Sequence, residues 1–196
     1  MYTRKTTGQR GLSLVEQIVF IVVVGVAVAG VLAALTVATR GSTDPMTQKQ
    51  ALAIAEAMLE EVQLQSFTYC DPDDTQAATA LSATVGPTGC NATVEAVGPE
   101  AAGPETRYST TAPFDNVNDY HGFDSSTALL TGIRDIDGTL ISGLDGYVVT
   151  VNVAEQALGA IPGAQSLLIA VTVTSPGNTT VTLHGYRVRY APNALP

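Results

Sequence analysis

The chain is poor in the residues on which most catalytic and metal sites depend. It has two cysteines and two histidines among 196 residues, and no Cys-x-x-Cys pair. A zinc site is therefore weakly supported, and Gly-x-Ser-x-Gly is absent as well. Neither histidine stands in the context of a catalytic triad. The composition predicts a protein that is not an enzyme and that has no cofactor or bound metal.

Basic residues are also scarce, because nine Lys and Arg face eighteen Asp and Glu. Three of the nine bases, Arg4, Lys5 and Arg10, come before a long apolar run, which leaves six bases against eighteen acids and a formal net charge of −12 for the remainder. Such a surface stays soluble and discourages binding to nucleic acid.

Residues 17–39 carry no charge, and as a helix rising about 1.5 Å per residue they would extend roughly 35 Å. That length spans the hydrocarbon core of a bilayer, about 30 Å. In lipid a helix satisfies its own backbone hydrogen bonds, so the many valines do not argue for a strand. The basic residues before the run predict a membrane helix with its amino terminus in the cytoplasm. Glu16 lies at the start of this helix, where a carboxylate usually has a partner or a function.

A short basic leader that ends in Gly11, followed by an apolar run with Glu16 as its fifth residue, resembles the signature of type IV prepilins. The resemblance implies that prepilin peptidase cuts between Gly11 and Leu12 and methylates the new amino terminus at Leu12. It also implies that Glu16 pairs with the corresponding amine of a neighbouring subunit as the fibre assembles, since two charges that are costly to bury alone become tolerable together. The chain departs from the commonest pattern in having Leu12 where Phe is usual.

Two other interpretations of this region stay open. In one, Glu16 lies among the lipid headgroups of an ordinary signal anchor. In the other, Ala27-Val28-Ala29 before Gly30 is a signal peptidase site, although the apolar run continues past it and Glu16 interrupts its start.

The sequence next predicts that residues 40–45 interrupt the first helix and that a second helix begins there. Asp44 suits an N-cap, and Pro45 suits the first helical position. This helix should run over residues 45–65, with one apolar face that packs on the core. The members of that face are Ala51, Ala55, Met58, Leu59 and Val62.

The carboxy-terminal third predicts three strands, which are rich in β-branched and aromatic residues and separated by turn signals. They lie at residues 146–153, 167–174 and 181–190. The turn at residues 175–178 predicts a hairpin of the last two strands, and the three together an antiparallel sheet with one face under the helix. Val171 and Val173 alternate with threonines and should face inward.

Residues 71–128 are predicted to be mostly loop, with a short strand over residues 92–97. Their acidic and amide side chains are oxygen ligands of the kind that suits Ca²⁺, but their spacing does not match an EF-hand loop, so solvated turns are the preferred interpretation. The two sets are Asp71, Asp73 and Asp74, and Asp115, Asn116, Asn118, Asp119 and Asp124.

Cys70 and Cys90 are expected to form a disulfide, because both follow the membrane helix in an exported chain. Closing a loop of this size contributes about 3 kcal/mol in the chain-entropy model. Free thiols or half of a metal site are the alternatives. His184, on a predicted strand, reads as a sheet surface residue, and His121, in a loop, is the better candidate for a site.

Segments of the exported part strengthen the resemblance and narrow it to MshD-type minor pilins of mannose-sensitive haemagglutinin (MSHA) pili. These segments are residues 44–61, 114–121 and 185–190. The resemblance implies a pilin-like α+β fold, with a long amino-terminal helix packed on a carboxy-terminal antiparallel sheet. The implied parts are a leader (1–11), a transmembrane and assembly helix (12–40), an amphipathic helix (41–69) and an exported loop-rich β domain (70–196).

The implied function is that of a minor pilin, which primes or caps a type IV fibre. Its partners would be prepilin peptidase, other pilins, the pilus assembly platform and the inner membrane, with the carboxy-terminal domain in the periplasm before assembly. A pseudopilin of a type II secretion system and a single-pass anchored binding domain are the alternatives.

Overall fold

The computed structural model describes residues 13–100, 105–127 and 131–195. Within them lie one α-helix, two short 3-10 helices and three strands. The chain divides into two compact units, Met1–Pro45 and Met46–Pro196. Helix and antiparallel sheet are separate in sequence, so the fold is of the α+β class.

The helix α1, Leu14–Leu64, is continuous over 51 residues and contains Pro45. The predicted interruption at residues 40–45, with Asp44 as the N-cap of a second helix, is therefore wrong. A proline removes one hydrogen bond from the helical ladder. Residues 46–64 are mostly strong helix formers such as Ala, Leu, Met, Glu and Gln, and they favour the helical state on the carboxy-terminal side. The helix ends one residue before the predicted end at Gln65.

The three predicted strands are confirmed, with ends that differ from the prediction by at most two residues. They are β1 (Val148–Glu155), β2 (Ser166–Thr174) and β3 (Thr180–Val188), in the antiparallel order β1-β2-β3. The short helix η2 (Gly163–Gln165) precedes β2. The predicted hairpin of β2 and β3 is also confirmed, and its turn places Asn178 at a φ of 59°, a left-handed conformation that asparagine tolerates.

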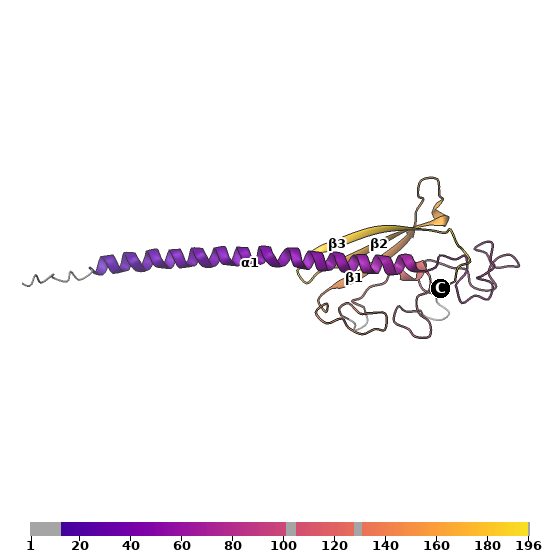
Figure 1. The fold of residues 1–196 in the computed structure, drawn as a ribbon, viewed down its shortest axis with the longest axis horizontal. Helices are drawn as coiled ribbons and strands as arrows, with labels where there is room; N and C mark the ends of the chain where they lie inside the picture. The colour runs from indigo at the N-terminus through magenta and orange to yellow at the C-terminus, as the bar shows by residue number, and fades with distance from the viewer. Residues whose placement is uncertain (1–12, 101–104, 128–130, 196) are drawn as a thin grey trace, which may run out of the picture. The chain divides into compact units, whose positions relative to one another are not determined.

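The part of α1 after Pro45 packs on one face of this sheet (Figure 1). Four of the five predicted helix residues, Ala51, Ala55, Met58 and Val62, are buried, and Leu59 packs at the border of the core. From the sheet, the inward residues of β1 and β2 fill the same core: Val149, Val151, Val153, Leu167, Ile169, Val171 and Val173. The predicted inward face of β2 is thus confirmed.

Gly185 on β3 lies against the side chains of Leu59 and Gln63 of the helix. A Cβ atom at this position would meet the side-chain amide of Gln63 and would lie 3.0 Å from Cδ1 of Leu59. A larger residue here would require the side chains of Gln63 and Leu59 to move.

Among the described residues between α1 and β1, the regular structure is the short helix η1, Val117–Tyr120, so the predicted loop character is confirmed. The predicted strand over residues 92–97 is wrong. Val94 makes a single bridge to Cys70, and the backbone N–H groups of Ala92 and Thr93 donate to the side chain of Asp74 instead of a strand ladder.

A loop segment covers the outer edge of β1. The N–H of Gly122 donates to the carbonyl of Val151 at 3.0 Å, and the N–H of Val151 donates to the carbonyl of Phe123 at 2.9 Å. The N–H of Ser125 donates to the carbonyl of Val149 at 2.9 Å. Residues 122–125 thereby satisfy backbone groups that an edge strand would leave unpaired.

Candidate functional site

The first part of α1 presents an apolar surface. The segment Leu14–Val37 has 24 residues and is long and apolar enough to cross a membrane, and none of it is buried within the described chain. Phe20 and Val26 are 67% and 69% exposed, and Val37 is 73% exposed. A continuous apolar surface of this kind marks contact with lipid or with another protein.

Ser13 caps the amino-terminal end of α1. Its hydroxyl accepts the N–H of Glu16 at 3.3 Å, and its carbonyl accepts the N–H groups of Glu16 and Gln17 at 3.0 and 3.2 Å. Ser13 and Glu16 thus occupy the positions of a capping box, in which a serine is followed three residues later by a glutamate. The spacing of Ser13 and Glu16 is readable in the sequence but was not among the predictions. This spacing places Glu16 at the amino-terminal cap of its own helix, beside its predicted role between subunits.

The predicted cleavage and methylation positions, Gly11 and Leu12, lie outside the described residues. The basic residues of the leader lie outside them as well. Processing between Gly11 and Leu12 therefore stays a prediction.

In the unit Met46–Pro196, Cys70 and Cys90 form the predicted disulfide, with their Cα atoms 5.4 Å apart. Asp74 holds the same loops together from within. Its carboxylate accepts four backbone N–H groups, from Gln76, Asn91, Ala92 and Thr93, at 2.7 to 2.9 Å. Burial acts to raise the pKa of Asp74, but these hydrogen bonds outweigh it and hold the pKa below its ordinary value.

Seven carboxylates that are distant in sequence meet beside this loop. They form overlapping groups of three, and in each group one ligand atom from every residue lies within 4.8 Å of the others. We call them the acidic cluster: Asp71, Asp73, Glu95, Glu100, Glu105, Asp115 and Asp119. The four aspartates were named from the sequence in two separate sets. The three glutamates were not predicted, because nothing in their spacing connects them to the aspartates.

Much of the acidic cluster is buried. Asp119 is fully buried, and Asp71, Glu95 and Glu105 are 8 to 9% exposed. The interpretation as solvated turns, which was made for the aspartates, is therefore wrong for Asp71 and Asp119. Asp119 accepts the N–H groups of Asp115 and Asn116 through Oδ2, at 3.0 and 2.7 Å.

Burial and mutual repulsion raise the pKa values in the acidic cluster. Burial, then the charges of Asp119 and Glu100, raise the pKa of Glu95 to about 10. Burial is also the largest cause for Asp115 and Asp119, whose pKa values rise to about 7. The pKa of Glu105 is raised by burial and by Asp119. In the protein alone, some of these carboxyl groups thus hold protons at neutral pH.

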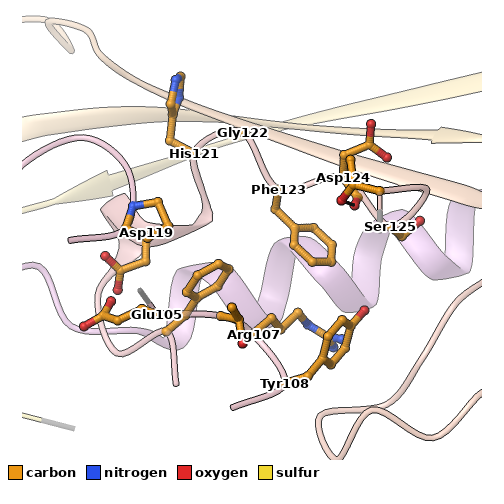
Figure 2. Close-up of a pocket in the computed structure, with 13 residues that line it drawn as sticks. Glu105, Arg107, Tyr108, Asp119, His121, Gly122, Phe123, Asp124 and Ser125 are labelled. Carbon is orange, nitrogen blue, oxygen red and sulfur yellow. Dashed lines mark hydrogen bonds between the residues drawn. The ribbon is translucent and has the colours of Figure 1, made fainter. Parts of the chain in front are cut away.

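A cavity of about 470 Å³ opens beside the acidic cluster (Figure 2). Glu105 and Asp119 point their carboxylates to one side of it, while Phe123 and Tyr108 line the other side. Arg107 also borders the cavity, but its guanidinium is paired with a carboxylate of α1. Its guanidinium makes two hydrogen bonds of 2.6 Å to Glu61 of α1.

The two histidines and Asp124 take no part in the acidic cluster. His121 borders the cavity and accepts the N–H of Val153 through Nδ1 at 3.3 Å. His184 is exposed on β3, as predicted. Asp124 accepts the N–H and the hydroxyl of Ser126, both at 2.7 Å, and so stabilises its own turn.

Comparison with known proteins adds no relative to these observations. No protein-family model, no curated protein and no solved structure matches the chain. The apolar segment of α1 and the acidic cluster are therefore the features from which a function must be argued.

Proposed function

We propose that the chain is a minor pilin of a type IV pilus of the MSHA kind, which enters the fibre through α1 and primes or caps its assembly. The observation that supports this proposal is the apolar segment Leu14–Val37, which is exposed along its whole length and carries Glu16 in its first turn. A subunit of this type needs one surface that suits both lipid, before assembly, and the helices of neighbouring subunits, after it.

In the proposed mechanism the leader holds the amino terminus on the cytoplasmic side, and the unit Met46–Pro196 is exported. Prepilin peptidase cuts between Gly11 and Leu12 and methylates the new amine. The amine is a cation, and Glu16 of an adjacent subunit neutralises it as the helix leaves the membrane for the fibre core. No step is catalysed by this chain.

The mass of the amino-terminal peptide, from protein purified out of native membranes, tests the processing. A peptide that begins at methylated Leu12 is expected. A start at Gly30 would mean signal peptidase cleavage, and an intact Met1 would mean an ordinary anchor. Either result would remove the basis of the proposal.

Substitutions at Glu16 separate the role between subunits from the role within the helix. Glutamine satisfies a capping box as glutamate does, but it has no charge to offer an amine. We expect Glu16→Gln and Glu16→Ala to be inserted and cleaved normally and to be lost, each at least about tenfold, from sheared fibres analysed by immunoblot. If Glu16→Gln enters fibres like the wild type while Glu16→Ala does not, Glu16 acts only as a helix cap.

A pseudopilin of a secretion system would use the same helix, and deletion of the chain distinguishes the two assemblies. Loss of surface fibres is expected for a minor pilin. Normal fibres with exported enzymes trapped in the periplasm would instead identify a pseudopilin.

A further inference from the structure

The acidic cluster brings together more buried carboxylates than the protein itself neutralises. We propose that it is a Ca²⁺ site, with Glu95, Glu100 and Asp119, which form one group of three, as the central ligands. Glu105, Asp71, Asp73 and Asp115 belong to the overlapping groups beside it and extend the acidic surroundings of the ion.

The donor atoms select the kind of ion. The groups of three contain carboxylate oxygens alone, with no histidine nitrogen and no cysteine sulfur. Oxygen ligands suit hard cations such as Ca²⁺ and Mg²⁺, whereas zinc prefers nitrogen and sulfur. The ligands come from separate loop segments, and Ca²⁺ accepts the irregular geometry and the higher ligand number that such a site supplies, while Mg²⁺ demands a near-ideal octahedron.

Several oxygen atoms of the cluster are buried without a hydrogen bond from any described residue. They are both carboxylate oxygens of Glu95, Oε1 of Glu100, Oε2 of Glu105 and Oδ1 of Asp119. Since Asp119 is fully buried and Glu95 is 9% exposed, water cannot readily solvate them. A buried polar atom without a partner is costly, and a buried charge without one is more so.

Asp74, in the same loops, is a carboxylate whose hydrogen-bond donors are all supplied by the protein backbone. Four backbone N–H groups converge on it, from Gln76 and from residues 91–93. By contrast, both oxygens of Glu95, two residues further along, accept no hydrogen bond from a described residue. The difference indicates that the partner of Glu95 is not supplied by the described chain.

Basic side chains do not fill this role either. In the described ranges, the one ion pair joins Arg107 to Glu61. Arg189 is close enough for Glu95 to influence its pKa, but its guanidinium lies 3.9 Å from the ring centre of Phe67 and donates to the carbonyl of Ala164 at 2.8 Å. A bound divalent cation would supply the missing positive charge.

A Ca²⁺ ion here would join loops that share little regular structure. Its central ligands come from residues 95–100 and from η1, and Asp71, in an overlapping group, follows directly after Cys70 of the disulfide.

The test uses the full-length protein in detergent micelles, stripped with EDTA and titrated with CaCl₂ by calorimetry. We expect saturable binding with a Kd between about 1 µM and 1 mM, as in sensor and extracellular sites. Saturating Ca²⁺ should raise the thermal midpoint by at least about 5 °C, and Mg²⁺ at the same concentration should raise it far less. If about 10 mM CaCl₂, which is tenfold above the weakest expected Kd, produces neither a binding heat nor a shift of the thermal midpoint, the proposal is wrong.

Glu95→Gln gives a second test, because its effect on the melting temperature should change when Ca²⁺ is added. Without Ca²⁺ this variant should melt at the same temperature as the wild type or above it, because the substitution removes a buried, repelled carboxyl group. With Ca²⁺ it should melt below the wild type and bind at least about tenfold more weakly. Asp137→Asn, at an exposed position outside the cluster, is the matched control and should bind like the wild type.

If Glu95→Gln and the wild type respond equally to Ca²⁺, the ion binds elsewhere and the assignment is wrong. The proposal does not depend on the pilin function. Loss of Ca²⁺ binding leaves the processing at Gly11 untouched, and an intact Met1 would leave the Ca²⁺ titration unchanged.

Discussion

Two regions of the unit Met46–Pro196 are stabilised in different ways. Residues 46–64 of α1 and the strands β1, β2 and β3 bury apolar side chains between a helix and a hydrogen-bonded sheet. The described residues between Ser66 and Thr127 add Val117 and Tyr120 to the apolar core, but they also bury carboxylates, an arginine and a disulfide, with little regular secondary structure. The comparison teaches that burial alone does not distinguish the regions. The regions differ in what they bury: apolar side chains pack without directional partners, whereas buried polar and charged groups need specific hydrogen-bond or ionic partners.

The two regions meet at Glu61 of α1. Its carboxylate accepts two hydrogen bonds of 2.6 Å from Arg107 and one of 2.9 Å from the hydroxyl of Tyr120. Arg107 is 6% exposed and also donates to the carbonyls of Arg134 and Asp135. This ion pair is therefore the polar contact by which the helix holds the loop region.

The largest effect is expected from breaking that contact. Glu61→Ala leaves the buried guanidinium of Arg107 without its counter-charge, so we expect a loss of about 3–5 kcal/mol in the free energy of unfolding, measured by urea denaturation. Glu60→Ala, one position earlier and exposed, is the control and should change the stability by less than about 0.5 kcal/mol. Equal effects of the two substitutions would show that Arg107 is solvated in solution.

A smaller effect, confined to one region, is expected from removing the disulfide. Cys70→Ser with Cys90→Ser should cost about 2–4 kcal/mol in the chain-entropy model. Hydrogen exchange should rise in the loops from Cys70 to Thr93 and stay unchanged in β2, because the sheet core does not contact the disulfide cluster. Faster exchange throughout β2 would mean that the two regions unfold as one.

The smallest effect is expected at Asp74. Asp74→Asn weakens the charge-assisted hydrogen bonds to the backbone and should cost about 1–3 kcal/mol at pH 7. Because the pKa of Asp74 is lower in the folded protein than in the unfolded chain, its stabilising effect is complete above the unfolded value and is lost as the pH falls. The difference in unfolding free energy between variant and wild type should therefore shrink between pH 5 and about pH 2. A difference that is constant with pH would contradict this role of the charge.

The sheet and its helix were predictable because their signal is local and periodic. The alternation of Val171 and Val173 with threonines fixes the inward face of β2, and the spacing of Ala51, Ala55 and Met58 fixes that of the helix. The continuity of α1 was not predicted, because Pro45 is a strong local signal for a break in a helix. The single backbone hydrogen bond that a proline removes does not by itself end the helix.

The acidic cluster was not predictable in the same way. Glu95 and Asp119 are 24 positions apart, and no period or motif joins them. Their meeting depends on the tertiary course of the loops, which Asp74, the disulfide and Glu61 set by contacts between distant residues. The strand predicted at residues 92–97 failed for the same reason, since the side chain of Asp74 takes the N–H groups that a ladder would need.

The covered edge of β1 has a consequence for self-association. Exposed strand edges recruit further strands from other molecules and so start aggregation. Residues 122–125 occupy the edge at β1, which leaves β3 as the edge of this sheet open to an added strand. Unwanted growth of the sheet is therefore restricted to the edge at β3.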